Sequence, residues 1–266
     1  MRRILLRCLL AALPTIGSVS HADSVVVQPS ADTTLIQYAP DNNLGGATFF
    51  NAGVNGKGTE SRGLFAFNFS QIPAGSIINA ATLTLEVVRE PAENSTPSTF
   101  ALHRVLQPWG EGDKTPGGTP EFPESPGLGS PATAGDATWN ERFFGSAPWS
   151  APGGVAGVDF AALITTELPV AGTFDSPYTV SDSGLIGDVQ YWVDHPQANF
   201  GWMLLTESSD TPSTARSFGA REDFLERGPV LEIDFTVVPE PSTLAFIGLA
   251  AASLLPALLR RLPGRR

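Results

Sequence analysis

The chain has 266 residues, with 27 acidic and 16 basic side chains and a formal net charge of −11. An acidic surface repels phosphate groups, so the charge argues against nucleic acids as partners. The single cysteine, Cys8, lies near the N-terminus, which excludes a disulfide framework and leaves the rest of the chain without a cysteine nucleophile or zinc ligand.

The N-terminus has the three parts of a secretory signal peptide. Arg2 and Arg3 form a basic start, an apolar run follows over residues 4–13, and Ser20-His21-Ala22 has the small-x-small pattern of a cleavage site. The apolar run is too short to span a bilayer. We therefore expect residues 1–22 to be a signal peptide cleaved after Ala22; the alternative is a short buried N-terminal helix.

The next two hundred residues have the pattern of short strands separated by turns. The 27 glycines and 23 prolines are spread along the chain, as expected where they form the turns between short strands. Apolar and polar residues alternate over 64–69, 81–87 and 230–235. Further strands are predicted over 24–28, 33–36, 48–52, 99–105 and 201–206. Alternation with period two places one face of a strand on a core and the other in water, which favours an all-β, antiparallel two-layer sandwich.

Two segments of this body are predicted to differ from the strands. Asp182 or Ser183 is placed to cap one short helix, whose apolar residues recur at intervals of three and four up to Val193, and Pro196 ends it. Residues 111–136 are rich in glycine and proline and predict a long surface loop, and 145–157 form a second open stretch.

The C-terminus has the pattern of a second targeting signal. Pro239-Glu240-Pro241 precedes an apolar run over 243–259, and an arginine cluster then closes the chain. The cluster consists of Arg260, Arg261, Arg265 and Arg266. As a helix the apolar run reaches about 24 Å, close to the roughly 30 Å hydrocarbon core, and arginines at its end favour the cytoplasmic side. We predict a transmembrane helix over 243–259 that leaves the body outside the inner membrane.

This three-part order resembles the PEP-CTERM sorting signal, here residues 237–266. The resemblance implies that an exosortase, a membrane protease-transpeptidase, recognises Pro239-Glu240-Pro241 and removes the tail. It also implies a Gram-negative bacterium that makes exopolysaccharide. The alternative is an ordinary permanent membrane anchor.

Without its two ends the body, residues 23–238, has nine basic and 26 acidic residues and a net charge of −17. Such a charge suits a soluble extracellular protein or one that binds cations.

An ordered set of phrases in the body resembles the DNRLRE-domain family. The phrases are ADTT at 31–34, RGLFAF at 62–67, IPAGSIINAATLTL at 72–85, WGEG at 109–112, ATWN at 137–140, the passage over 189–201, SFGARE at 217–222 and PVLEIDF at 229–235. The resemblance implies a jelly-roll-like, carbohydrate-binding-module-like sandwich over residues 23–236, and some relatives bind acidic glycans. The insertion over 111–136 departs from the family pattern.

The body offers little catalytic chemistry. Outside the signal its histidines are His103 and His195, and neither belongs to a metalloprotease, nucleophile-elbow or phosphate-loop motif. No catalytic residue is assigned. No cofactor is required, although carboxylates can hold a structural Ca²⁺. The candidate ligands are Asp32, Glu111, Asp136 and Asp159; the alternative for each is a solvated turn residue.

Tryptophans near the loops are the candidates for glycan contact, because sugar rings stack on aromatic faces. They are Trp109, Trp139 and Trp149, with Arg142 as a partner for acidic sugars. The alternative is that these side chains pack in the core.

These patterns predict a non-enzymatic protein of the cell surface or extracellular matrix. It is exported, anchored for a time in the inner membrane, processed by an exosortase, and contacts exopolysaccharide. Two alternatives stay open: a purely structural envelope or matrix component without a ligand, and a polysaccharide-degrading enzyme that uses two carboxylates.

Overall fold

The computed structural model describes residues 22–116 and 127–238. The signal peptide up to His21, the Pro-Glu-Pro motif, the apolar run over 243–259 and the terminal arginines lie outside the described residues. Ala22–Val237 forms one compact unit. It is 41% strand and 7% helix, which confirms a mostly β fold with a single α-helix. No helix within the described ranges is long and apolar enough to cross a membrane.

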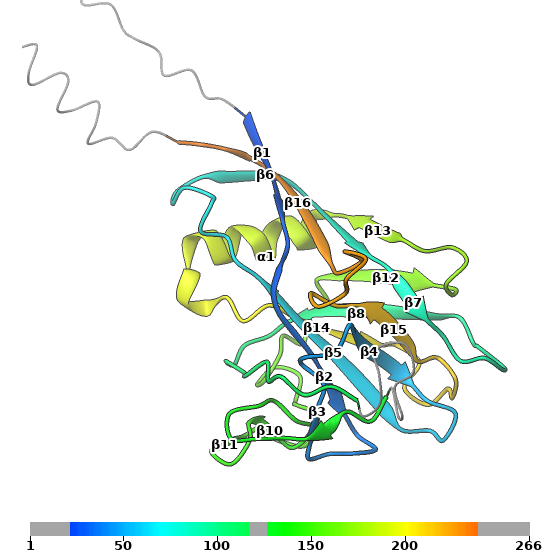
Figure 1. Cartoon of the computed structure of the whole chain (residues 1–266). Coiled ribbons are helices and arrows are strands. Elements are labelled where there is room, and N and C mark those ends of the chain that lie inside the picture. The colour runs from blue at the N-terminus through cyan, green and yellow to red at the C-terminus, as the bar shows by residue number, and fades with distance from the viewer. Residues whose placement is uncertain (1–21, 117–126, 239–266) are drawn as a thin grey trace, which may run out of the picture. The chain divides into compact units, whose positions relative to one another are not determined.

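The strands are short and are arranged in two principal antiparallel sheets and two small pairs (Figure 1). The four-stranded sheet has the order β1 (Ala22–Val27), β16 (Val230–Thr236), β6 (Ile77–Leu85), β13 (Tyr178–Ser181). The eight-stranded sheet has the order β12 (Thr166–Val170), β8 (Ser98–Arg104), β14 (Trp202–Thr206), β5 (Glu60–Phe67), β4 (Phe49–Val54), β15 (Arg216–Gly219), β7 (Val87–Arg89), with β2 (Pro29–Ile36) paired to β5. The small pairs are β3 (Asn42–Asn43) with β9 (Ser130–Pro131) and β10 (Glu141–Phe143) with β11 (Ala147–Pro148).

The main core joins the two large sheets. Its buried residues come from both of them and from the helix α1 (Ser183–Asp194). In the four-stranded sheet, β6 and β16 alternate between buried and exposed positions as their sequences predict. Trp192 of α1 packs edge-on against Trp202 of β14, with ring centroids 4.7 Å apart, so the helix is anchored to the larger sheet by aromatic contact.

Strand β5 departs from the one-sided pattern. Phe65 and Phe67 belong to the main core, as predicted, but Leu64 on the opposite face is also fully buried. A second cluster covers that face, because the segment between β8 and β12 folds back over the eight-stranded sheet and contributes Val105, Trp149 and other apolar side chains. The larger sheet is therefore buried on both faces at this point.

The helix begins and ends where its sequence signals predict. The Asp182 carboxylate accepts hydrogen bonds from the backbone N–H groups of Gly184 and Leu185, which satisfies donors that have no partner inside the helix. The last helical residue is Asp194, and His195 stands directly before Pro196. A single 3₁₀ turn, η1 (Pro196–Ala198), follows.

The turn over residues 70–76 connects the two sheets. It is closed by hydrogen bonds from Ile72 N–H to Phe69 O and from Ser76 N–H to Pro73 O, and Gly75 has φ +77°. Strand β5, which precedes it, lies in the larger sheet, and β6, which follows, lies in the smaller one. The chain therefore passes from one sheet to the other here and does not form a hairpin.

Candidate metal centre

Three carboxylates from distant parts of the chain meet at one place. Asp32 lies on β2, Glu111 follows β8, and Glu222 follows β15. One oxygen of each lies within 4.8 Å of an oxygen of the other two. Within residues 22–116 and 127–238 they form the only group of three or more acidic, histidine or cysteine side chains close enough to share a metal ion. Two of the four predicted ligands, Asp32 and Glu111, thus converge.

Asp32 is the buried member of this cluster, with 1% of its surface exposed. Its backbone N–H donates to Glu111 Oε1 at 2.9 Å, and its Oδ2 accepts from the backbone N–H of Arg221 at 2.7 Å. Burial, aided by the charges of Glu222 and Glu111, raises the pKa of the Asp32 carboxyl to about 8, although the hydrogen bond from the Arg221 N–H acts to lower it. A nearby cation would favour the ionised form.

Among the described residues, Arg221 is the one basic side chain that pairs with the cluster. Its guanidinium lies 3.0 Å from Glu111 Oε1 and also forms an ion pair with Glu222 Oε1. The other oxygen of Glu222, Oε2, is fully buried and has no hydrogen-bond partner. Burial raises the pKa of the Glu222 carboxyl, and the Arg221 charge opposes this shift. Three carboxylates therefore share a single guanidinium.

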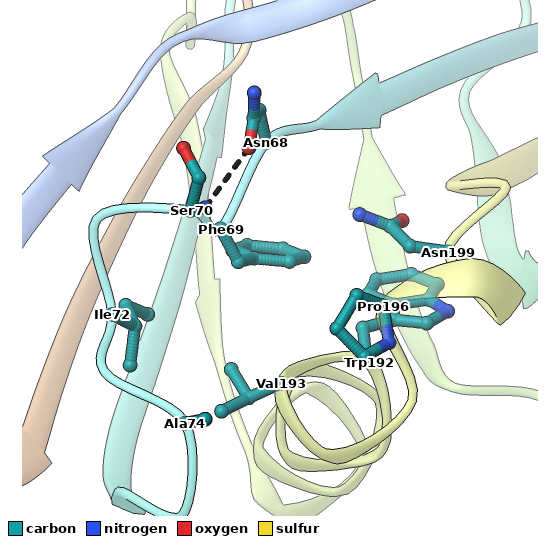
Figure 2. Close-up of a pocket in the computed structure, with 9 residues that line it drawn as sticks. All are labelled: Asn68, Phe69, Ser70, Ile72, Ala74, Trp192, Val193, Pro196 and Asn199. Carbon is teal, nitrogen blue, oxygen red and sulfur yellow. Dashed lines mark hydrogen bonds between the residues drawn. The ribbon is translucent and has the colours of Figure 1, made fainter.

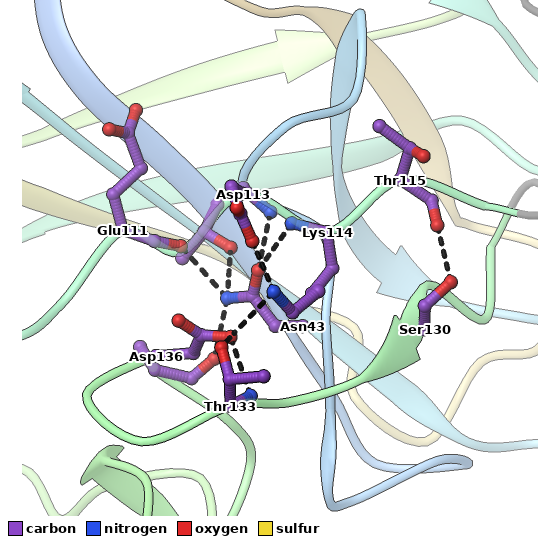
Figure 3. Close-up of polar contacts among 11 residues, drawn as sticks. Asn43, Glu111, Asp113, Lys114, Thr115, Ser130, Thr133 and Asp136 are labelled. Atoms are coloured by element: carbon purple, nitrogen blue, oxygen red, sulfur yellow. Dashed lines mark hydrogen bonds and ion pairs between the residues drawn. The ribbon is translucent and has the colours of Figure 1, made fainter.

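Asn43 fixes the backbone from which Glu111 projects (Figure 3). The Asn43 side chain is fully buried and its Nδ2 donates to Glu111 O at 2.8 Å and to Ala137 O at 2.9 Å. Its Oδ1 accepts from the N–H groups of Gly45 and Lys114. In Figure 3 the Glu111 carboxylate points away from Asn43, so the amide positions the chain without taking part in the cluster.

The described parts of the glycine- and proline-rich segment are tied to the rest of the unit. Residues 111–116 are held by Asn43, and β9 pairs with β3 through Asn42 and Asn43. The Ser130 hydroxyl donates to Thr115 O at 2.5 Å across the segment. Gly45 packs against the Glu111 carbonyl so closely that a Cβ there would lie 2.1 Å from the oxygen. Residues 117–126 lie outside the description.

Asp136 and Asp159 do not join the cluster. Asp136 Oδ2 accepts from the backbone N–H of Thr133 at 2.8 Å and from its hydroxyl at 3.1 Å. Asp159 Oδ2 accepts from the backbone N–H groups of Ser150 at 3.0 Å and Val155 at 2.8 Å. Both carboxylates bind donors of their own loops, as turn residues do, but they are buried, with 7% and 2% of their surfaces exposed, and not solvated as their alternative supposed.

The three candidate tryptophans pack within the unit. Trp139 and Trp149 are 7% and 3% exposed and belong to the cluster on the outer face of the larger sheet, and Trp109 packs against it. The Trp149 indole N–H donates to Thr138 O, and that of Trp109 donates to Phe200 O. Trp139 and Trp149 are thus packing residues in this conformation, and Trp109 is partly buried against them.

The arginine proposed with these tryptophans also has local contacts. Arg142 Nη1 donates to Pro108 O at 3.2 Å, and its guanidinium lies 5.5 Å from the centre of the Phe143 ring. Arg62, another arginine that the sequence offers as a partner for acidic sugars, lies 5.1 Å from the Trp139 ring and donates to Gly153 O. Both arginines hold the loops that cover the larger sheet.

The two histidines contact backbone carbonyl groups. His103 Nδ1 lies 2.8 Å from Ala161 O, and His195 Nδ1 lies 3.0 Å from Tyr191 O at the end of α1. His103 packs edge-on against Phe160. These contacts agree with packing and helix-end roles and do not bring either ring to the carboxylate cluster.

An apolar pocket of about 190 Å³ lies between the turn over 70–76 and the end of α1 (Figure 2). The stacked rings of Phe69 and Trp192, 5.8 Å apart, form one side, with Ile72 and Val193 beyond them. None of the lining side chains is titratable. The pocket therefore offers no acid, base or metal ligand.

Glu222 is the site residue that the sequence prediction missed. It stands at the end of the phrase SFGARE, one residue after Arg221. The three carboxylates stand in the three resembling phrases at 31–34, 109–112 and 217–222, so the shared phrases held the signal that could have identified it.

The chain matches no protein-family model and no curated protein. The resemblances to the PEP-CTERM signal and to the DNRLRE domain therefore rest on the phrases quoted above.

Proposed function

We propose that this chain is an exported, non-enzymatic protein of the cell surface or extracellular matrix that contacts exopolysaccharide. In this proposal the body is a jelly-roll-like sandwich of the DNRLRE type, and an exosortase processes the tail at Pro239-Glu240-Pro241. The observation that carries it is the order of segments: a signal peptide, a β-rich body, Pro-Glu-Pro, one apolar run and an arginine cluster.

The way the two ends of the unit meet supports attachment through one edge. Strand β1 pairs with β16 along its whole length, with Ala22 opposite Thr236. The expected cleavage site and the start of the sorting signal thus stand side by side. In Figure 1 the strands β3, β10 and β11 and their loops lie at the other end of the unit. A body tethered at Thr236 would present those loops outward.

Sorting is tested by changing the motif in a host that has an exosortase. The wild-type chain is expected to lose its tail, with a corresponding fall in mass, and to reach the outer surface or the medium. The variant Glu240→Ala is expected to keep the tail and to stay with the inner membrane, whereas the control Glu232→Ala, an exposed residue of β16, behaves as wild type. Equal mass and location for wild type and Glu240→Ala would refute the sorting proposal.

Glycan contact is tested on an array of neutral and acidic polysaccharides, with and without calcium. Because the body has a net charge of −17, binding to acidic chains is expected to need a divalent cation, and binding to neutral chains is not. Absence of binding to every glycan, both with and without calcium, would contradict the proposed contact. Release of new reducing ends from exopolysaccharide would instead identify a polysaccharide-degrading enzyme.

One observation favours a second candidate, a structural matrix component without a ligand. The tryptophans that could stack on sugar rings are engaged in packing. If Trp109→Ala lowers stability and leaves glycan retention unchanged, the indole is a packing residue, and a structural role without sugar contact gains weight.

A further inference from the structure

We infer that Asp32, Glu111 and Glu222 bind one Ca²⁺ ion, which joins β2 to the segments that follow β8 and β15. This site concerns the folded body alone and goes beyond the proposed function. Neither export nor glycan contact is needed for it.

The spacing of the three carboxylates fits one ion. Calcium is bound by oxygens at about 2.3–2.6 Å, so two ligand oxygens on the same ion are at most about 5 Å apart. The three oxygens here lie within 4.8 Å of one another. They come from positions 32, 111 and 222, so an ion among them would crosslink segments that are far apart in the sequence.

Unsatisfied acceptors are an independent indication of a ligand. Glu222 Oε2 has no hydrogen-bond partner although the atom is fully buried. The side chain of Asp32 beside it is 1% exposed, and its Oδ2 accepts from the Arg221 N–H. Buried acceptors are almost always satisfied, and one left without a partner is unfavourable. A cation among the carboxylate oxygens would give Glu222 Oε2 a partner.

The negative charge of the three carboxylates is also only partly neutralised by nearby basic side chains. The three carboxylates together have three negative charges when ionised, and Arg221 supplies one positive charge. The next basic side chain along this loop, Arg227, is engaged by Asp223 at 2.7 Å. The cluster therefore keeps a net charge of −2, which one divalent cation would balance.

The chemistry of the donors selects calcium among divalent ions. All three side chains are carboxylates, which are hard oxygen ligands, and the cluster has no histidine or cysteine to favour zinc or copper. Magnesium demands a near-octahedral shell and keeps several waters, whereas calcium accepts irregular arrangements of six to eight oxygens. Ligands from a strand and two loops suit the less demanding ion.

The test is calcium titration of the full-length chain in detergent after treatment with EGTA. Calorimetry is expected to show one saturable site with a Kd on the order of 10⁻⁴ M, typical of extracellular modules, and weaker binding of magnesium. Calcium at a hundred times Kd should raise Tm by about 5–10 °C for a body of this size. A wild-type chain without saturable calcium binding would overturn the inference.

The decisive variant is Glu222→Gln, which keeps the shape of the side chain and removes its charge. We expect calcium affinity to fall at least tenfold, and Tm in EGTA to stay equal to wild type or to rise, because one carboxylate less is buried. The matched control is Glu232→Gln, an exposed glutamate of β16 away from the cluster, for which calcium affinity should not change. Equal calcium affinity of the two variants would place the ion elsewhere and refute this site.

Discussion

The amide of Asn43 offers the sharpest test of how the loop beside the carboxylate cluster is held. It has five hydrogen-bond partners: the two hydrogens of Nδ2 are shared among Glu111 O (2.8 Å), Ala137 O (2.9 Å) and the more distant Thr33 Oγ1 (3.2 Å), and Oδ1 accepts from the N–H groups of Gly45 (2.9 Å) and Lys114 (3.3 Å). Asn43 itself is fully buried.

The cost of Asn43→Ala follows from these contacts. A neutral hydrogen bond contributes about 0.5–1.5 kcal/mol net, so the contacts with five partners amount to at most roughly 7 kcal/mol. The bonds to Glu111 and Lys114 are only partly buried, and water can replace them after truncation. We therefore expect the free energy of unfolding to fall by about 3–4 kcal/mol, a large share of the 5–15 kcal/mol typical of a domain.

The assay is urea unfolding of the full-length chain in detergent, followed by tryptophan fluorescence. Asn43→Asp serves as the isosteric variant, since it keeps the volume but turns an oxygen towards three acceptors; its loss should be at least as large. The control is Asn79→Ala, an exposed side chain with one hydrogen bond to Thr236, for which we expect a loss below about 0.5 kcal/mol. If Asn43→Ala costs no more than Asn79→Ala, the hydrogen-bonding argument is wrong.

Three further outcomes are expected from single substitutions. Trp149→Ala should lower the free energy of unfolding by about 3–5 kcal/mol in urea, since the ring is 3% exposed; a loss under about 1 kcal/mol would contradict its packing role. Gly201→Ala should lower Tm far more than Gly75→Ala. Both glycines have φ near +75°, but only at Gly201 would a Cβ lie 2.2 Å from a backbone oxygen, that of Phe65. Similar Tm values for the two variants would refute the steric argument. The hydroxyl and N–H of Thr173 lower the pKa of Glu90, so this carboxylate stabilises the fold above its unfolded pKa and the stabilisation is lost as pH falls through the lower folded pKa. Wild type should thus exceed Glu90→Gln by less than about 1 kcal/mol in urea unfolding at pH 7, since the group is largely solvated, and this difference should shrink as the pH is lowered below the ordinary glutamate pKa of 4.5.

The carboxylate cluster shows where prediction from residue types stops. Asp32 and Glu111 were candidates together with Asp136 and Asp159, because each is an acidic residue near a turn. Nothing in the local sequence separates a carboxylate that meets others from one that binds the N–H groups of its own loop. That difference depends on which segments the sheets bring together: β15, which precedes Glu222, pairs with β4 and β7 in the same sheet that holds β2 and Asp32.

The loops give a second instance. Glycine, proline and few aliphatic residues predict an open segment over 111–136, and its composition has no periodicity to suggest otherwise. In the folded unit its described parts are held by Asn43, whose side chain was not predicted to have any role. A buried amide that bonds distant backbone groups leaves no local pattern, because its partners at Glu111 and Ala137 lie far along the chain.

What the sequence determined by itself is the local order: the strands with period-two alternation and one helix capped at Asp182 or Ser183 that ends before Pro196; the signals expected at both ends stay predictions. These depend on side-chain periodicity, capping and proline, which act over a few residues. The tertiary structure decided which strands pair, that the outer face of β5 is covered, and that three carboxylates meet. Those outcomes depend on contacts between segments separated by up to about two hundred residues, and such contacts form only when whole faces pack to remove apolar surface from water.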